Sequence, residues 1–216
     1  MPDLAPFATL RSRAGRSRGS ARRYSPPVVT DPVPRPARVR RQYEASDAQH
    51  TLELPPAELL QRNAERLRAA LEAAQAPGVR RAGQELLDHL ADFYRVPSPR
   101  LTILGVRPHR VRDGHLESEL HGDYTIETGV LRAWMRTAIL GKVTSYRGML
   151  NTLLHEFAHH LDVHLFGWPD TPHTRGFYWR VDELYHLALG TPADKRKRLV
   201  WIQTGARWRI DWSKLR

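Results

Sequence analysis

The sequence has 216 residues, of which 41% are hydrophobic and 26% are charged, so the chain can form one domain around a hydrophobic core. It contains no cysteine, which excludes a disulfide-stapled scaffold, a cysteine-ligated metal site and a cysteine nucleophile. No apolar run approaches the roughly 20 residues needed to cross a bilayer, and residues 1–10 lack the apolar stretch of a secretory signal. We therefore expect a cytoplasmic protein that does not associate with a membrane.

The formal net charge of +11 comes from the two ends of the chain. Residues 1–41 contain ten arginines against two aspartates, and residues 191–216 contain eight Lys and Arg against two aspartates. Basic ends of this kind can bind nucleic acid non-specifically through its phosphates, or they can be solvated arms. The arginines of residues 11–23 have no aromatic neighbour that could stack on bases, which favours the solvated arm.

Residues 1–50 are rich in Arg, Ser and Pro and show neither a helical nor a strand period, which predicts a disordered basic arm. Residues 51–216 are expected to form a single domain. Its first elements are two helices, about 55–74 and 79–95, whose leucines recur on one face and which are separated by a Pro-Gly pair. These helices are predicted to form an antiparallel hairpin.

A β-type region follows, in which turn signals separate four short runs of strand-forming residues, at 101–106, 116–121, 124–128 and 130–135. We expect them to form a small antiparallel sheet. Thr144 or Ser145 then caps a long helix that reaches about residue 166, and a further helix should occupy about 174–189. The order of helices, sheet and helices predicts an α+β fold.

The long predicted helix contains the motif His155-Glu156-x-x-His159. Histidines four residues apart lie on one face of a helix, so both imidazoles can bind one zinc ion. The carboxylate of Glu156 can then serve as the general base that takes a proton from a metal-activated water. The wide apolar face of this helix predicts that it is buried and rigid. The alternative is a buried helix whose histidines only pack and form hydrogen bonds.

A catalytic zinc site needs a third protein ligand, and the downstream candidates are Asp162, His164, His173, Asp182, Glu183 and His186. His173 is favoured because it precedes the next helix, after a connection that turns the chain back towards the first histidines. Glu183 is the second candidate, by analogy with proteases whose third ligand is a glutamate on the following helix. Asp162 has a short side chain that is better suited to orienting a ligand histidine.

Together, His155-Glu156-x-x-His159 and His173-Thr-Arg-Gly-Phe177 resemble the SprT-like zinc metallopeptidases, in which HExxH is followed by a histidine with an aromatic residue four positions on. The resemblance covers roughly residues 100–190. It implies a small sheet beside an active-site helix, zinc held by the three histidines, Glu156 as general base and a protein or peptide substrate, which in parts of the family is bound to DNA. Many members carry a C-terminal four-cysteine zinc ribbon, which this chain lacks.

Further residues are candidates for contacts with a substrate. An extended peptide can add to the edge of the predicted sheet near residues 124–130, and Tyr178, Tyr185 or His186 can donate a hydrogen bond to the oxyanion of the transition state. The C-terminal segment interleaves arginines with Trp201, Trp208 and Trp212. We expect these rings to pack on the core in a terminal hairpin. The alternative function is nucleic-acid binding through the basic ends, with a structural or inactive zinc site.

Overall fold

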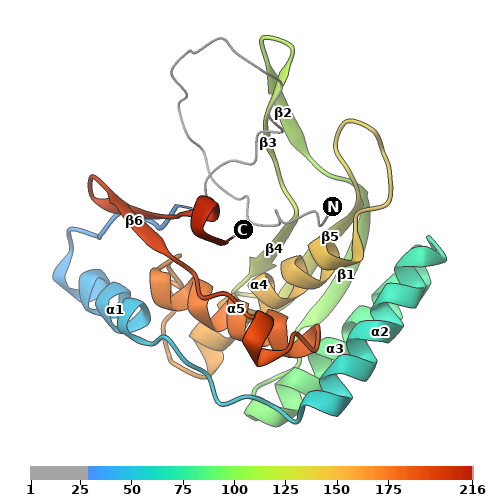
Figure 1. Cartoon of the computed structure of the whole chain (residues 1–216), viewed down its shortest axis with the longest axis horizontal. Coiled ribbons are helices and arrows are strands. Elements are labelled where there is room, and N and C mark those ends of the chain that lie inside the picture. Colours follow the sequence, from blue (N-terminus) through green and yellow to red (C-terminus); the bar gives the residue numbers. More distant parts are fainter. Residues whose placement is uncertain (1–28, 216) are drawn as a thin grey trace.

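The computed structural model describes residues 29–215 and confirms the predicted α+β fold (Figure 1). The helices are α1 (Ala37–Ala48), α2 (Ala57–Glu72), α3 (Ala76–Tyr94), α4 (Tyr146–His164) and α5 (Arg175–Ala188), with short 3-10 turns at Ala193–Lys195 and Trp212–Leu215. The strands are β1 (Arg100–Val106), β2 (His109–Arg112), β3 (His115–Glu119), β4 (Gly122–Thr125), β5 (Val130–Arg136), β6 (Trp201–Thr204) and β7 (Arg207–Ile210). None of the described helices is long and apolar enough to span a membrane.

The predicted helical hairpin is present as α2 and α3, whose leucines form much of the main core. Pro77 lies within the first turn of α3 and not in a loop between the two helices. A proline is tolerated there because a backbone N–H in the first turn has no partner within the helix. Arg95 ends α3 in the left-handed conformation, with a φ of 56°. The hairpin packs through α3 against β1 and through α2 against α4 and α5.

The central sheet has the strand order β1-β5-β4. The predicted antiparallel pairing is found between β4 and β5, whereas β1 runs parallel to β5. The reason is the two-stranded ribbon of β2 and β3, which reverses the chain once before the β4–β5 turn reverses it again. This ribbon projects from the rest of the molecule, so the predicted strand at 116–121 does not belong to the central sheet (Figure 1).

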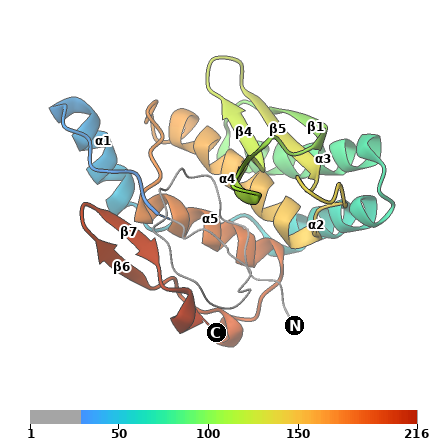
Figure 2. The ribbon, with the colours of Figure 1, turned by 90° about the horizontal axis from the view of Figure 1, so that it is seen from above.

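Helix α4 runs between the central sheet and α5, as the view from above shows (Figure 2). Ser145 caps its N-terminus, where its side-chain oxygen accepts a hydrogen bond from the backbone N–H of Gly148 at 3.1 Å. Every residue from Met149 to Asp162 is buried. The predicted buried helix is therefore confirmed, and it gives the HExxH motif a rigid setting.

Helix α1 corrects the prediction of a disordered arm through residue 50, which is wrong for residues 37–48. The sequence of α1 shows no apolar period, and only Tyr43 and Ser46 are buried in it. Polar contacts with α5 hold it instead, and it approaches α5 so closely that a Cβ at Gly176 would lie 2.0 Å from the carbonyl oxygen of Ser46. The prediction is also wrong for residues 29–31, whose backbone pairs with His173 and with β7. Residues 1–28 of the predicted arm lie outside the described residues.

The C-terminal segment forms the antiparallel hairpin of β6 and β7, and the prediction that its rings pack on the core is confirmed for Trp201. The side chain of Trp212 lies outside the described part of the structure. The ring of Trp201 lies 5.8 Å from that of Tyr178 and packs against a second apolar cluster, in which Phe177 and Ile210 are fully buried. Trp208 lies under the guanidinium group of Arg175, at 4.4 Å. These contacts favour a structural role for the two rings.

Candidate metal centre

Three imidazole nitrogens converge between α4 and the start of α5. His173 Nε2 lies 3.1 Å from His155 Nε2 and 3.2 Å from His159 Nε2, and one ligand atom from each ring lies within 4.8 Å of the others. Zinc–nitrogen bonds of about 2.0–2.1 Å in a tetrahedral site place two ligand nitrogens about 3.3 Å apart. The three histidines are therefore close enough to bind one metal ion, and the two spacings to His173 fit those of a zinc site.

Phe177 packs against all three rings. Its centroid lies 5.0 Å from that of His155, 4.5 Å from that of His159 and 5.1 Å from that of His173. The phenyl ring is fully buried, so it restricts each imidazole to a narrow range of orientations. The aromatic residue four positions after the third histidine thus has a direct structural role at the cluster.

His173 is brought to the cluster by the connection that follows α4. This connection turns back through a hydrogen bond from the backbone N–H of Trp168 to the carbonyl of Asp162, at 2.7 Å. Thr174 then caps α5, and its hydroxyl oxygen accepts a hydrogen bond from the N–H of Phe177 at 3.0 Å. His173 therefore lies directly before the helix, as the sequence indicates.

The other candidates for the third ligand lie elsewhere. Glu183 is 3.6 Å from the guanidinium group of Arg196, and Asp182 lies between Arg196 and His186, at 3.4 Å from each. His164 is exposed at the end of α4, beside the hydroxyl of Tyr124. Within residues 29–215, the structure gathers His173 with the two helix histidines and none of these alternatives.

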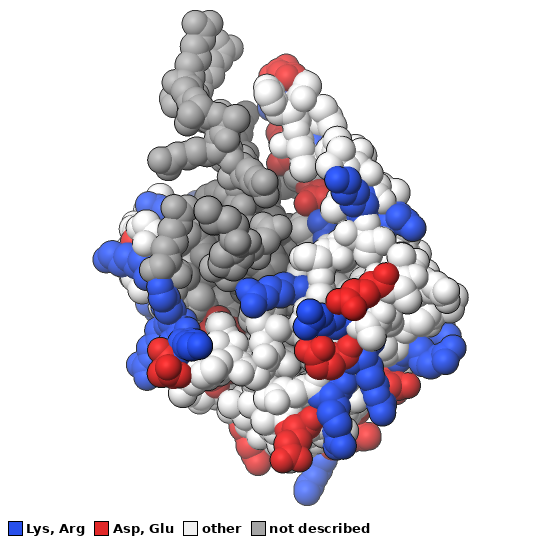
Figure 3. Space-filling model, turned by 45° about the vertical axis from the view of Figure 1, so that its right-hand side comes forward, with Lys and Arg blue, Asp and Glu red and all other residues white. Residues whose placement is uncertain are grey.

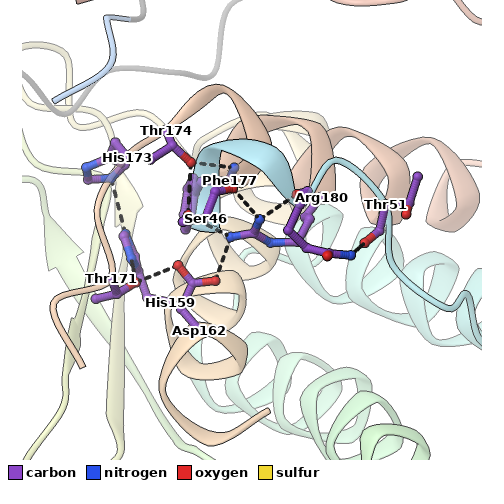
Figure 4. A network of polar contacts seen from close by, with 10 residues as sticks. Ser46, Thr51, His159, Asp162, Thr171, His173, Thr174, Phe177 and Arg180 are labelled. Carbon is purple, nitrogen blue, oxygen red and sulfur yellow. Dashed lines mark hydrogen bonds and ion pairs between the residues drawn. The ribbon is translucent and has the colours of Figure 1, made fainter. Parts of the chain in front are cut away.

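Asp162 acts on His159 through Thr171 (Figure 4). The Nδ1 of His159 lies 2.7 Å from the Thr171 hydroxyl, which in turn donates to Asp162 Oδ2 at 3.1 Å. With Nε2 facing the other histidines, Nδ1 carries the proton and donates to Thr171. The predicted orienting role of Asp162 is thus exerted through a bridging hydroxyl.

Arg180 completes this network from α5. Its Nη2 donates to Asp162 Oδ1 at 2.6 Å, and its Nη1 donates to the carbonyl oxygens of Ser46 and Gln49 at the end of α1. Burial raises the pKa of Asp162 to about 6, although Arg180 and Thr171 lower it in part. The carboxyl is therefore ionised at neutral pH, where it forms a buried ion pair with Arg180.

The electrostatics of the helix histidines suit metal binding. Burial, followed by the neighbouring His173, lowers the pKa of both His155 and His159 well below the usual range for histidine. Both rings are therefore neutral at pH 7, with a free lone pair on one nitrogen. This is the form of imidazole that binds a metal ion.

Glu156 lies beside strand β4 and is 5% exposed. A Cβ at Gly122 would lie 3.0 Å from Glu156 Oε1, so the missing side chain of this glycine makes room for the carboxyl group. Burial, with a contribution from Asp123, raises the pKa of Glu156 to about 8. A cation held by the three histidines would favour the ionised carboxylate.

Sequence reasoning missed two residues at this site, Asp31 and His121. Asp31 contacts His173 from the segment that precedes α1. His121 directly precedes Gly122, and its Nε2 lies 3.2 Å from Glu119 Oε1. Hydrogen bonding to His121, together with the charge of Arg107, lowers the pKa of Glu119 to about 2. No sequence motif marks Asp31, whose partner His173 is 142 residues away in the chain. Nor does one mark His121, which adds to burial and to His173 in lowering the pKa of His155 on α4.

Of the predicted oxyanion donors, only Tyr178 reaches the cluster. Its ring is buried and lies 5.8 Å from that of His173 and 6.1 Å from that of His155. Tyr185 packs in the main core, and His186 contacts Thr191 and Asp182. Neither of these two is placed at the cluster.

The surface seen in Figure 3 bears on the alternative of nucleic-acid binding. On this face, Lys and Arg side chains are interspersed with Asp and Glu, and they do not gather into one basic patch. A continuous basic groove would be expected if the face tracked a phosphate backbone. Nucleic-acid binding therefore stays a prediction that concerns the basic ends of the chain.

No protein-family model, curated protein or solved structure matches the chain. The resemblance to SprT-like metallopeptidases thus depends on the two motifs and has no further support from these comparisons.

Proposed function

We propose that the protein is a zinc-dependent metallopeptidase, in which His155, His159 and His173 hold the ion and Glu156 is the general base. The observation that carries this proposal is the convergence of three imidazole nitrogens at 3.1 and 3.2 Å, with a buried carboxyl group on the next residue of the same helix. Structural zinc sites use four protein ligands, whereas three ligands leave a position for water or substrate.

The donor set favours zinc over magnesium and calcium. Three neutral imidazoles suit zinc, while magnesium and calcium prefer oxygen ligands. A zinc ion bound there would polarise a substrate carbonyl and lower the pKa of a water towards about 7. His159 is oriented by the chain of contacts through Thr171 and Asp162 to Arg180. This chain would keep the ligand rigid during turnover.

In this proposal, Glu156 moves the proton of the reaction. In its ionised form the carboxylate accepts a proton from the attacking water and returns it to the leaving amine. Strand β4, which lies against α4 beside this carboxyl group, forms an edge of the central sheet. An extended peptide can pair with that edge, which would bring a scissile bond close to Glu156.

The metal content tests the first half of the proposal. Elemental analysis of the untagged protein is expected to find close to one zinc per chain, and His155→Ala and His173→Ala are each expected to lose it. His164→Ala is the matched control, because this histidine is on the same helix but is exposed and outside the cluster. A wild-type protein that stays without zinc after reconstitution would contradict the proposal.

The variant Glu156→Gln tests the second half. It is expected to keep its zinc and its fold but to lose peptide hydrolysis by about 10²–10⁴-fold, the usual contribution of a general base. Cleavage is measured by mass spectrometry on a mixture of unfolded proteins, with wild-type protein treated with a chelator as the negative control. Equal cleavage by Glu156→Gln and the wild type would show that the assigned role is wrong.

A further inference from the structure

Asp31 contacts the third histidine through both its backbone and its side chain. Its Oδ2 accepts a hydrogen bond from the backbone N–H of His173 at 2.9 Å and lies 3.4 Å from Nδ1 of the same residue. In return, the backbone N–H of Asp31 donates to the carbonyl of His173 at 2.8 Å. One carboxylate oxygen therefore faces both the main chain and the ring of His173.

Asp31 is itself held from two sides. The hydroxyl of Tyr43, on α1, donates to the carbonyl of Asp31 at 3.0 Å. On the other side, the preceding residue Thr30 exchanges two hydrogen bonds with Trp208 of β7, at 2.8 and 3.0 Å. The backbone of Asp31 is thus fixed relative to both α1 and the C-terminal hairpin, which keeps its carboxylate beside His173.

We propose that Asp31 is a positioning residue for the third metal ligand. Its carboxylate holds the proton of His173 on Nδ1, so that the lone pair of Nε2 points at His155 and His159. This proposal depends only on the metal-binding part of the proposed function. It makes residues 29–31 a part of the metal centre, although they precede the predicted domain.

The arrangement gives each of two ligands its own carboxylate. His159 is oriented by Asp162 through Thr171, and His173 is oriented directly by Asp31. The two paths share no residue, so removal of one should leave the other intact. Partners of this kind typically contribute 10- to 100-fold to metal affinity.

The test is Asp31→Asn in the full chain, with zinc affinity measured by competition with a chelating dye. The amide oxygen can still accept from the backbone of His173, but the charge that holds the ring proton is lost. We expect zinc to bind about 10- to 100-fold more weakly. Asp31→Glu, which keeps a carboxylate, should lose less affinity than Asp31→Asn, and the reverse order would indicate a steric role and overturn the proposal.

Asp47→Asn is the matched control. Asp47, on α1, also joins the N-terminal part of the described chain to the start of α5. It accepts hydrogen bonds from the backbone N–H of Arg175, at 2.9 Å, and from its guanidinium group. Its hydrogen bonds go to Arg175 and not to a ligand histidine. We expect this variant to lower the unfolding temperature and to leave zinc affinity within about twofold. A zinc affinity that falls equally in both variants would make Asp31 a general structural residue and overturn the proposal.

The protonation of the ring gives a readout that needs no metal. In the metal-free wild type, two-bond ¹H–¹⁵N spectra are expected to show His173 with its proton on Nδ1, and Asp31→Asn should give a mixture of the two tautomers. An unchanged tautomer together with unchanged zinc affinity would overturn the proposal. If the wild type binds no zinc, the metallopeptidase proposal fails, while the tautomer still decides the role of Asp31.

Discussion

The two halves of the metal centre are held in place by different kinds of contact. His155 and His159 are one turn apart on α4, and the geometry of a single buried helix brings them together. His173 is held instead by Asp31, which is 142 residues away in the sequence, and by a helix start that contacts Ser46 across 128 residues. The spacing of His155 and His159 depends on local helix geometry, whereas the position of His173 depends on contacts between segments that are distant in the chain.

The largest effect is expected from Arg180→Met, because Arg180 on α5 contacts both Asp162 of α4 and the end of α1. The Arg180 side chain is 1% exposed and that of Asp162 is fully buried, so the substitution leaves an unpaired buried carboxylate and removes the donor to two carbonyls of α1. We expect a loss of about 3–5 kcal/mol in the free energy of unfolding, measured with urea. Zinc affinity should fall as well, because Asp162 orients His159 through Thr171.

Arg175→Met is the control for this prediction. Arg175 is also on α5 and forms an ion pair, in this case with Asp47 of α1. Its side chain is 31% exposed, so water can replace the partner. A loss of about 1 kcal/mol is expected. If the two substitutions lowered the free energy of unfolding equally, the burial of Arg180 would not explain its contribution to stability.

The sequence predicted the α4 half well because its signals are local. The apolar spacing marks the helix, HExxH marks two ligands, and the position of His173 before α5 follows from the turn and cap residues around it. Helix α1 could not be predicted in this way, since its contacts with α5 are polar and only Tyr43 and Ser46 are buried in it. Asp31 was missed for the same reason, because its partner is far away in the chain.

The free energy of unfolding should fall in acid, because α4 contains a buried histidine that is neutral in the folded protein. His160 is buried, with Nδ1 at 2.9 Å from the hydroxyl of Tyr124 and Nε2 at 2.7 Å from the carbonyl of Pro97, and burial lowers its pKa to about 4. An unfolded histidine has a pKa near 6.5, so the unfolded chain takes up the proton first as the pH falls. The contribution of neutral His160 to the free energy of unfolding is therefore complete above about pH 6.5. It falls by about 3 kcal/mol as the pH is lowered towards 4.

Urea unfolding of the metal-free protein at pH 7, 6 and 5 measures this loss. His155 and His159 contribute in the same direction, because burial lowers their pKa too, so the test is the difference between the wild type and His160→Gln. The glutamine cannot titrate, and the acid loss should be smaller in this variant. His164→Gln, at an exposed position one turn on, should keep the acid loss of the wild type. An identical pH dependence in all three proteins would show that His160 is not the group responsible.

The smallest effects are expected at the two helix caps, and they separate the two halves most directly. Ser145 is exposed and accepts one hydrogen bond at the start of α4, so Ser145→Ala should lower the stability by about 1 kcal/mol without changing zinc affinity. Thr174 is fully buried, and its hydroxyl contacts both the N–H of Phe177 and the hydroxyl of Ser46. Thr174→Ala should therefore cost about 2 kcal/mol. It should also weaken zinc binding, because this cap directly follows His173 and joins it to α1. If Ser145→Ala and Thr174→Ala changed zinc affinity equally, the contacts between the start of α5 and α1 would not be what holds His173.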